Sequence, residues 1–172
     1  ELIPQHYGVD VDLAQLPEDK EVYEVLQKAD TVGMFQVESR AQMASLPRNY
    51  PTRFYDLVVQ VAIIRPGPIV GKMMHPYMRR RQKKEAVTYP HPSLEPVLKR
   101  TLGVPLFQEQ LLRIAMTVAN FTGAEAEELR RAVGMRRSWE RMKNLEGKLR
   151  AGMAANGINT KTQDTIVENI SS

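Results

Sequence analysis

Two short stretches of the chain place polar side chains inside apolar runs. Residues 31–40 contain the polar residues Gln36, Glu38, Ser39 and Arg40. Residues 62–68 read Ala-Ile-Ile-Arg-Pro-Gly-Pro and contain Arg65. Polar groups in such surroundings need hydrogen-bond partners when the chain folds, or they serve a ligand. Because a guanidinium group fits phosphate oxygens two at a time, both stretches are candidates for binding a nucleotide or a nucleic-acid backbone.

Each stretch also has a purely structural interpretation. In the first, Ser39 would be an ordinary helix residue and its charged neighbours a solvated set, and the residues alone favour this interpretation. In the second, Arg65 would be a surface residue after a helix terminator. The rigid Pro-Gly-Pro flank favours binding there, because prearranged donors lose less entropy when a ligand binds.

Two later segments combine amides, acids and arginines within expected helices. The amides of Gln108 and Gln110 could contact bases or sugars. Arg130 and Arg131 point about 100° apart on a helix, so that one can face a ligand while the other pairs locally. Glu127 precedes them by three and four residues, which also predicts simple ion pairs within the helix.

Positive charge is concentrated after the first thirty residues. Residues 1–30 have a net charge of −6 and the remaining residues a net charge of +10. A basic body favours a polyanionic partner, although a solvated basic surface explains the excess equally well. The candidates for contacts with backbone phosphates are Arg136, Arg137, Arg79, Arg80 and Arg81.

Composition excludes several kinds of site. The chain has no cysteine, so disulfides and thiolate metal sites are excluded, and its 3 histidines lie far apart in sequence. Asp10 and Asp12 form a pair without a strand around it, and we assign no metal to them. No apolar run is long enough to cross a bilayer. The chain begins at Glu1 rather than methionine, which suggests a piece of a longer protein.

Hydrophobic periodicity predicts an all-α fold, mostly helical with irregular connections. We expect residues 1–18 to be a linker, and residues 87–89 are a candidate short strand. Thr52, Ser93, Thr122 and Ser138 are expected to cap helices, Thr122 in a capping box with Glu125. The helices are expected at residues 20–28, 36–46 (stopped by Pro47), 53–64 (broken by Arg65-Pro-Gly-Pro68), 71–82, 93–100, 108–120, 123–133, 138–155 (ended by Gly157) and 160–172.

Four strings occur in an order and spacing that resemble the C-family bacterial DNA polymerases, which are the alpha subunits of DNA polymerase III and their error-prone relatives. These strings are Phe35-Gln-Val-Glu-Ser-Arg40, Arg65-Pro-Gly-Pro68, Phe107-Gln-Glu-Gln110 and Leu129-Arg-Arg-Ala132. The similarity runs from about Val11 to the end of the chain. Replicative members commonly have leucine in place of Val37 and tyrosine in place of Phe107, so the resemblance is closer to the error-prone type.

The resemblance implies an architecture and an activity. Residues 1–18 would follow the palm, and residues 19–172 would be the N-terminal part of the fingers domain, truncated at its C-terminus. The parent would add deoxynucleotides to a primer 3′ end in error-prone or translesion repair synthesis, with Mg²⁺ bound by aspartates of the palm. This chain would contain no catalytic residue and no metal ligand, so we expect it to be inactive alone.

The same resemblance implies partners and residue roles. The partners would be primer–template DNA, deoxynucleoside triphosphates and accessory proteins of replication or the DNA-damage response, in the bacterial cytoplasm at the nucleoid and without a membrane. Arg130 and Arg131 would contact the triphosphate or the template. The supporting residues of the nucleotide pocket would be Gln36, Glu38, Ser39, Arg40 and Arg65.

Two alternatives remain at this stage. The chain could be an independent helical module that binds nucleic acid, or a module whose basic face binds an acidic protein. Phosphate contact predicts DNA binding that falls steeply with salt, whereas a protein-docking module predicts little DNA binding.

Overall fold

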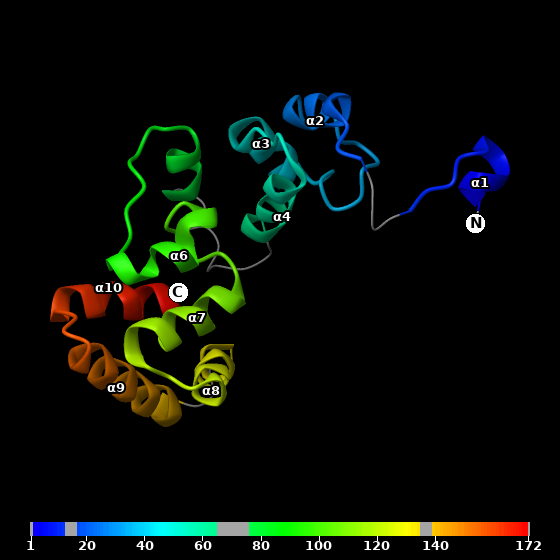
Figure 1. Cartoon of the computed structure of the whole chain (residues 1–172). Helices are drawn as coiled ribbons and strands as arrows, with labels where there is room; N and C mark the ends of the chain where they lie inside the picture. The colour runs from blue at the N-terminus through cyan, green and yellow to red at the C-terminus, as the bar shows by residue number, and fades with distance from the viewer. Residues whose placement is uncertain (1, 13–16, 65–75, 135–138, 172) are drawn as a thin grey trace. The chain divides into compact units, whose positions relative to one another are not determined.

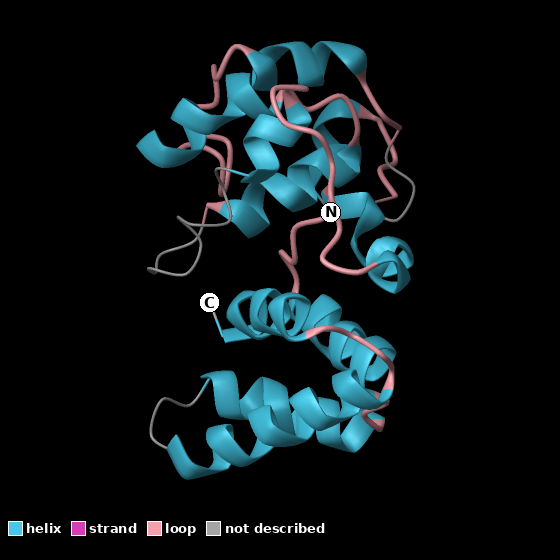
Figure 2. Ribbon diagram, turned by 90° about the vertical axis from the view of Figure 1, so that its left-hand side faces the viewer, coloured by secondary structure: helices cyan, strands magenta, loops and turns pink. Residues whose placement is uncertain are grey.

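The computed structural model of the chain describes residues 2–12, 17–64, 76–134 and 139–171, and within these ranges all regular structure is helical (Figures 1 and 2). The prediction of an all-α fold is therefore confirmed. The α-helices are α1 (Leu2–Tyr7), α2 (Lys20–Gln27), α3 (Arg40–Asn49), α4 (Phe54–Ile63), α6 (Glu95–Leu98), α7 (Gln108–Ala119), α8 (Gly123–Gly134), α9 (Trp139–Ala155) and α10 (Thr160–Ser171). The 3-10 helices are η1 (Pro92–Leu94) and η2 (Lys99–Thr101), and residues 76–81 are also helical.

The chain forms two compact units, residues 1–60 and 61–172. In the first unit, α2 packs against α3. Leu26 and Leu46 are buried. A buried amide joins α4 to α3, since Gln60 Nε2 donates to Gln42 Oε1 at 2.7 Å and lies 2.5 Å from Ser45 Oγ. These contacts hold the first turns of α3, which begins at Arg40, the last residue of the candidate stretch 31–40.

The loop before α3 is held by its own side chains. Thr31 Oγ1 donates to the carbonyl oxygen of Val37 at 2.7 Å, and the amide of Gly33 donates to Glu38 Oε2 at 3.1 Å. Gln36 has a φ of 68°, outside the helical range. Ser39 then caps α3 by accepting from the amide of Gln42 at 3.3 Å. The predicted helix start at Gln36 is therefore wrong, because the Ser39 cap sets the boundary.

Pro47 does not stop α3, contrary to the prediction. It lies inside the last turn, and the helix continues to Asn49. A proline there removes one hydrogen bond of the helix without preventing its closure. The closing bond runs from the amide of Tyr50, which has a φ of 50°, to the carbonyl oxygen of Leu46 at 2.8 Å.

The second unit is built around α7, which packs against both α8 and α9 (Figure 1). Among the described residues, its core contains sixteen buried side chains between Leu94 and Ile170. The α7–α9 approach is close at Gly152, where an added Cβ would lie 2.3 Å from the carbonyl oxygen of Ala119. At the other end of α7, Gln108 meets Arg130 of α8, so that several candidate residues of this unit lie close together there.

Several local predictions are confirmed. Thr122 and Glu125 form the expected capping box: the amide of Thr122 donates to Glu125 Oε2 at 2.9 Å, and the amide of Glu125 lies 3.4 Å from Thr122 Oγ1. Gly157 ends α9 with a φ of 74°, and the amide of Ile158 donates to the carbonyl oxygen of Met153 at 3.0 Å. α2, α7 and α10 lie where periodicity placed them.

Other local predictions are wrong. Residues 2–7 form α1 within the expected linker, and residues 87–89 are not a strand. His91, not Ser93, occupies the N-cap before η1, where its Nδ1 accepts from the amide of Ser93 at 3.4 Å. The hydroxyl of Thr52 donates to Asp56 Oδ2 at 3.2 Å instead of capping an amide of α4. The Pro66-Gly67-Pro68 bend, the helix start at residue 71 and the Ser138 cap lie outside the described residues.

Candidate nucleotide and nucleic-acid interface

The most connected group of candidate residues lies where the start of α7 meets α8, and we call it the α7–α8 polar cluster: Gln108, Glu127, Arg130 and Arg131. Arg130 Nε and Nη2 donate to the two carboxylate oxygens of Glu127 at 2.8 and 2.7 Å. Arg130 Nη1 donates to Gln108 Oε1 at 3.1 Å. Arg131 Nε donates to Glu127 Oε1 at 3.0 Å. The fold thus joins one amide of α7 to three charged side chains of α8.

The cluster keeps its charges at neutral pH. Hydrogen bonds from Arg130 and then from Arg131 lower the pKa of Glu127 to about 2. The hydrogen bond to Glu127 raises the pKa of Arg130. Two cations share one carboxylate, so these three groups carry a net positive charge that can attract an anion.

The two arginines differ in exposure. The side chain of Arg130 is 32% exposed and that of Arg131 is 65% exposed. The terminal amino groups Nη1 and Nη2 of Arg131 have no hydrogen-bond partner among the described residues. The intrahelical ion pairs expected from spacing are therefore present, and they leave donors of Arg131 available to a ligand.

Gln110 lies two residues beyond Gln108 and is buried. Its Oε1 accepts from the amides of Leu106 and Phe107 at 2.8 and 3.0 Å. Its Nε2 donates to the carbonyl oxygen of Val97 at 3.1 Å and to Thr101 Oγ1 at 2.8 Å. The amide of Gln110 thus holds the loop before α7 against the segment 97–101.

The basic run 79–81 contains three different environments. Arg80 is 12% exposed and its Nη1 donates to the carbonyl oxygen of Leu102 at 2.7 Å, while its Nε donates to Glu85 Oε1 at 3.0 Å. Arg79 is 67% exposed and lies 3.8 Å from Glu85 Oε2. Arg81 is half-buried. Arg80 therefore connects segments of the second unit, and Arg79 is the most accessible cation of the run.

The candidates in residues 31–40 belong to the first unit. Gln36, Glu38, Ser39 and Arg40 are all exposed. Phe35, directly before them in the chain, is 86% exposed, and the sequence analysis assigned this side chain no role. The sequence feature that could have indicated its exposure is Gly33. A glycine readily adopts the φ of 84° that turns the chain just before the phenylalanine. Arg65, Arg136 and Arg137 lie outside the described residues.

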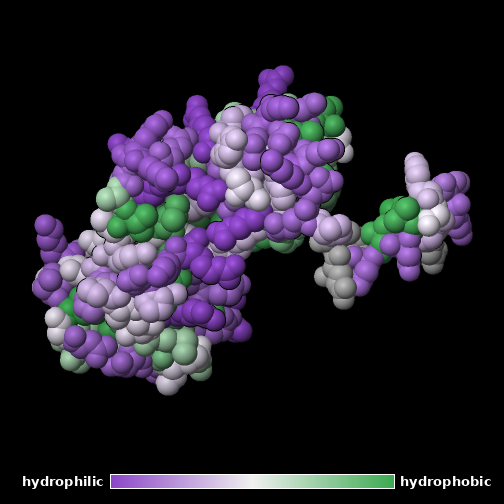
Figure 3. All heavy atoms as spheres, turned by 45° about the horizontal axis from the view of Figure 1, so that its top comes forward, coloured by the Kyte–Doolittle hydropathy of each residue, from purple (hydrophilic) through white to green (hydrophobic). Residues whose placement is uncertain are grey.

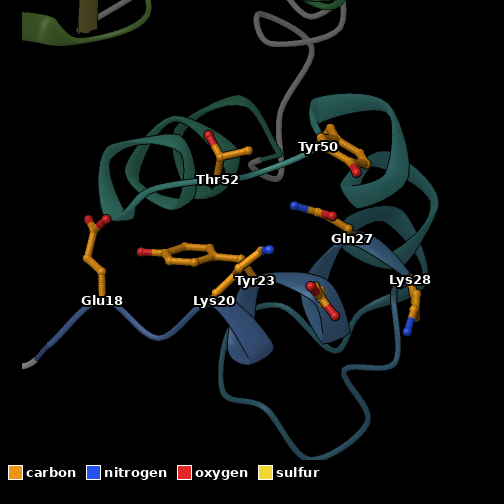
Figure 4. Close-up of a pocket in the computed structure, with 8 residues that line it drawn as sticks. Glu18, Lys20, Tyr23, Gln27, Lys28, Tyr50 and Thr52 are labelled. Carbon is orange, nitrogen blue, oxygen red and sulfur yellow. The ribbon is translucent and has the colours of Figure 1, made fainter.

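A cavity of about 840 Å³ in the first unit lies apart from every predicted site residue. It is lined by Glu18, Lys20, Tyr23, Glu24, Gln27, Lys28, Tyr50 and Thr52. The ring of Tyr23 points toward Glu18 (Figure 4). Burial and the nearby Glu18 carboxylate raise the pKa of Tyr23.

A second cavity, of about 360 Å³, lies in the second unit and is lined by Pro76, Arg80, Thr88, Tyr89, Pro90, Gly103, Val104, Pro105, Thr165, Glu168 and Asn169. Hydrophilic side chains predominate on the face drawn in Figure 3, and apolar ones form separate small patches. The described residues contain no group of three or more histidine and acidic side chains placed to hold a metal ion. None of the helices in this part of the chain is both long enough and apolar enough to cross a membrane.

Known proteins resemble this chain over nearly its whole length. The family described as bacterial DNA polymerase III alpha subunit finger domain matches residues 1–157. An error-prone DNA polymerase of Nocardia farcinica is 58% identical over 172 residues, which is 99% of this chain and 15% of the relative. Those of Mycobacterium tuberculosis H37Rv and Pseudomonas savastanoi pv. phaseolicola are 55% and 53% identical, over 99% of this chain and 16% of each relative. The chain thus spans about a sixth of the length of these relatives.

Proposed function

Because this chain belongs to the finger domains of bacterial DNA polymerase III alpha subunits, we propose that the whole protein is a template-directed DNA polymerase. It adds deoxynucleotides to a primer 3′ end and releases pyrophosphate. The similarity to relatives named error-prone DNA polymerase supports a role in error-prone or translesion repair synthesis. Its substrates are primer–template DNA and deoxynucleoside triphosphates, and its other partners are proteins of replication or the DNA-damage response at the bacterial nucleoid.

The observation that carries this proposal for the chain itself is the α7–α8 polar cluster. Nucleotidyl transfer develops negative charge on the phosphates, and prearranged cations stabilise that charge. Arg131 offers exposed donors, and Arg130 is held beside it by Glu127 and Gln108. This part of the protein therefore positions the incoming nucleotide or the template.

The remaining candidates take supporting roles in the proposal. Gln36, Glu38, Ser39, Arg40 and Arg65 would support binding of the nucleotide, while Arg79, Arg81, Arg136 and Arg137 would bind backbone phosphates. Arg80 and Gln110 act by holding neighbouring segments in place, since most of their donors and acceptors are occupied within the fold.

The metal ion belongs to another part of the protein. Mg²⁺ would neutralise the triphosphate and activate the primer hydroxyl. The described residues do not fit it, because none of their acidic side chains form a metal-binding group. We therefore expect the chain alone to incorporate no nucleotide, and a rate above that of a protein-free control would contradict this expectation.

The test is the affinity of this chain for a primer–template duplex over a series of salt concentrations. We expect log Kd to rise linearly with log salt, with a slope of about 0.9 for each phosphate contacted. The double substitution Arg130→Ala/Arg131→Ala should weaken binding and reduce that slope. A matched control is Arg150→Ala, which also removes a paired arginine, on α9. A DNA affinity that does not depend on the salt concentration would contradict the proposed surface. So would an affinity that the double substitution leaves unchanged.

A further inference from the structure

The cavity of about 360 Å³ in the second unit has none of the residues of the α7–α8 polar cluster in its lining. Its walls come from residues 76–80, from residues 88–105 and from α10. The volume lies in the range of about 300–1,000 Å³ that is typical of sites for small organic groups. Apolar and flat side chains supply much of the lining: Pro76, Tyr89, Pro90, Val104 and Pro105.

Arg80 adds a flat cation to this lining. Its Nε donates to Glu85 Oε1 at 3.0 Å, and its Nη1 donates to the carbonyl oxygen of Leu102 at 2.7 Å. Its Nη2 donates to Thr88 Oγ1 at 3.1 Å. Gly103 makes room for this arrangement, because an added Cβ would lie 2.7 Å from Arg80 Nη1. Since each nitrogen has an acceptor within the fold, Arg80 offers a ligand mainly the face of its guanidinium group and not a fork for phosphate.

Two polar groups in the lining have no hydrogen-bond partner among the described residues. They are the side-chain amide of Asn169 and the hydroxyl of Tyr89. Both side chains are half-buried. A carboxamide has donors and an acceptor, and a phenol has one donor and also accepts. These two groups are therefore available to the polar edge of a ligand.

The charges of the lining favour a ligand without net charge. Glu168 and Arg80 supply one carboxylate and one guanidinium, so that neither an anion nor a cation is favoured. A nucleobase is neutral and flat, stacks on aromatic rings and on guanidinium planes, and has donors and acceptors along its edge. Residues 61–172 contain nineteen basic and ten acidic residues, which supports a base that belongs to a nucleic-acid strand.

We therefore propose that this cavity binds an unpaired nucleobase of single-stranded DNA. The base stacks against Tyr89 and the guanidinium face of Arg80, and its edge forms hydrogen bonds with Asn169. The choice of DNA as the partner rests on the proposed function, but the site itself is separate from the α7–α8 polar cluster and does not depend on contacts with phosphate. A base held there would fix the position of the strand, while exposed arginines contact its backbone.

The test measures the affinity of the intact chain for two primer–template duplexes that differ only in the single-stranded overhang of the template. One overhang consists of deoxyadenosines, and the other consists of abasic sites, which keep the phosphates and lack the bases. We expect the first to bind at least about fivefold more tightly, because stacking of a base on protein side chains adds to affinity. This ratio of affinities should not change with salt, since both probes have the same phosphates. A ratio of one would overturn the proposal.

Two substitutions locate the effect in the cavity. Asn169→Ala should lower the ratio and leave the melting temperature unchanged, because the amide has no partner within the described fold. Tyr89→Leu should lower the ratio further, while leucine keeps an apolar side chain against the core cluster. The matched controls are Asn144→Ala, which removes an exposed amide from α9, and Tyr55→Leu, which removes a half-buried tyrosine from α4. Both controls should keep the ratio of the wild type, and an equal loss in them would refute the site.

Two further probes test other places and other sources for the base. Phe35 is 86% exposed, and its ring could also stack on a base. If Phe35→Ala removes the ratio and Asn169→Ala does not, the base binds at the loop before α3 and the proposal is wrong. Deoxyadenosine, measured by calorimetry, separates a free nucleoside from a strand. If Asn169→Ala weakens binding of deoxyadenosine while the ratio for DNA is one, the cavity binds a free nucleoside and its assignment to single-stranded DNA falls.

Failure of this proposal can be separated from failure of the proposed function. Arg130→Ala/Arg131→Ala should weaken the binding of both overhangs equally and leave their ratio unchanged. If both overhangs bind with an affinity that depends on salt and their ratio is one, the base site falls and the proposed phosphate contacts stand. If neither overhang binds even at low salt, the proposed DNA surface of the chain falls together with the base site.

Discussion

Gln108 and Gln110 lie two residues apart at the start of α7 and meet opposite environments. Gln108 is exposed and accepts one hydrogen bond, from Arg130. Gln110 is 8% exposed and satisfies two backbone amides, one carbonyl oxygen and one hydroxyl. At position 108 the glutamine side chain is part of a surface cluster. At position 110 it supplies hydrogen bonds that the helix start and the loop before it lack.

Gln110→Ala should destabilise the chain by about 2–3 kcal/mol, because buried donors and acceptors would lose their partner. Gln108→Ala is the control, and we expect it to cost about 0.5–1 kcal/mol for one exposed hydrogen bond. Urea unfolding followed by circular dichroism measures both. Equal losses for the two substitutions would show that burial of the Gln110 amide is not what makes it important.

Acid should destabilise the second unit through two carboxylates of α8. Interactions led by Lys148 hold the pKa of Glu125 at about 2, and those led by Arg130 hold the pKa of Glu127 at about 2, against 4.5 for the ordinary group. Because both values are depressed in the folded state, the stabilisation is complete above about pH 4.5 and is lost as the pH falls toward 2.

The measurement is the free energy of unfolding of the wild type and of Glu125→Gln/Glu127→Gln between pH 6 and the acid limit. Glutamine at position 125 keeps the capping-box acceptor, so the substitution removes mainly charge. The advantage of the wild type should shrink with falling pH, and high salt should reduce it at every pH because both groups are solvent-accessible. Parallel curves for the two proteins would contradict this assignment.

At the scale of elements, alanine substitutions at the two glycines of α9 distinguish the effect of close packing on stability from the effect of helix propensity. A Cβ at Gly152 would lie 2.3 Å from the carbonyl oxygen of Ala119 on α7, whereas a Cβ at Gly147 would meet nothing within 4 Å. Gly152→Ala should therefore destabilise the chain by about 1–3 kcal/mol through overpacking. Gly147→Ala should stabilise it by about 0.5–1 kcal/mol, because alanine is the better helix former. Thermal unfolding of both variants tests these opposite signs, and a Gly152→Ala variant as stable as the wild type or more so would contradict the α7–α9 packing.

The elements that sequence predicts well are those whose signals are local. The capping box of Thr122 with Glu125 and the glycine that ends α9 need only neighbouring residues, and both predictions are confirmed. The start of α3 was misplaced, because periodicity cannot detect that Gln36 adopts a positive φ in a loop held by Thr31. The sequence did not indicate the cap at His91, because serine is a preferred N-cap residue and histidine is not, so that Ser93 was the expected cap.

In the candidate site, too, the sequence predicted the local contacts and not the long-range ones. Spacing alone indicated the pairs of Glu127 with Arg130 and Arg131, and these pairs are present. It could not indicate that Gln108 meets Arg130, since that contact depends on how α7 packs against α8. Nor could it indicate that Arg80 reaches the carbonyl oxygen of Leu102, which lies 22 residues away in sequence. Long-range packing thus decides which polar residues remain available to a ligand.

At the scale of the whole molecule, charge divides between the two units. Residues 1–60 contain five basic and ten acidic residues, and residues 61–172 contain nineteen basic and ten acidic residues. The hydrophobic core cluster also lies entirely in the second unit, between Leu94 and Ile170. The second unit therefore has both the charge to attract a polyanion and a core of its own.

We accordingly predict that residues 76–172 fold alone and carry the DNA affinity of the chain. This piece contains the whole core cluster and the α7–α8 polar cluster, so it should unfold cooperatively on heating. It should bind a primer–template duplex with the same salt dependence as the intact chain, because both make the same phosphate contacts. Residues 1–64, whose net charge is negative, should bind none at the same salt concentration. If residues 1–64 bind DNA as tightly as residues 76–172, the contacts with phosphate lie in the loop before α3. The arginines of α8 would then not be the residues that hold the DNA.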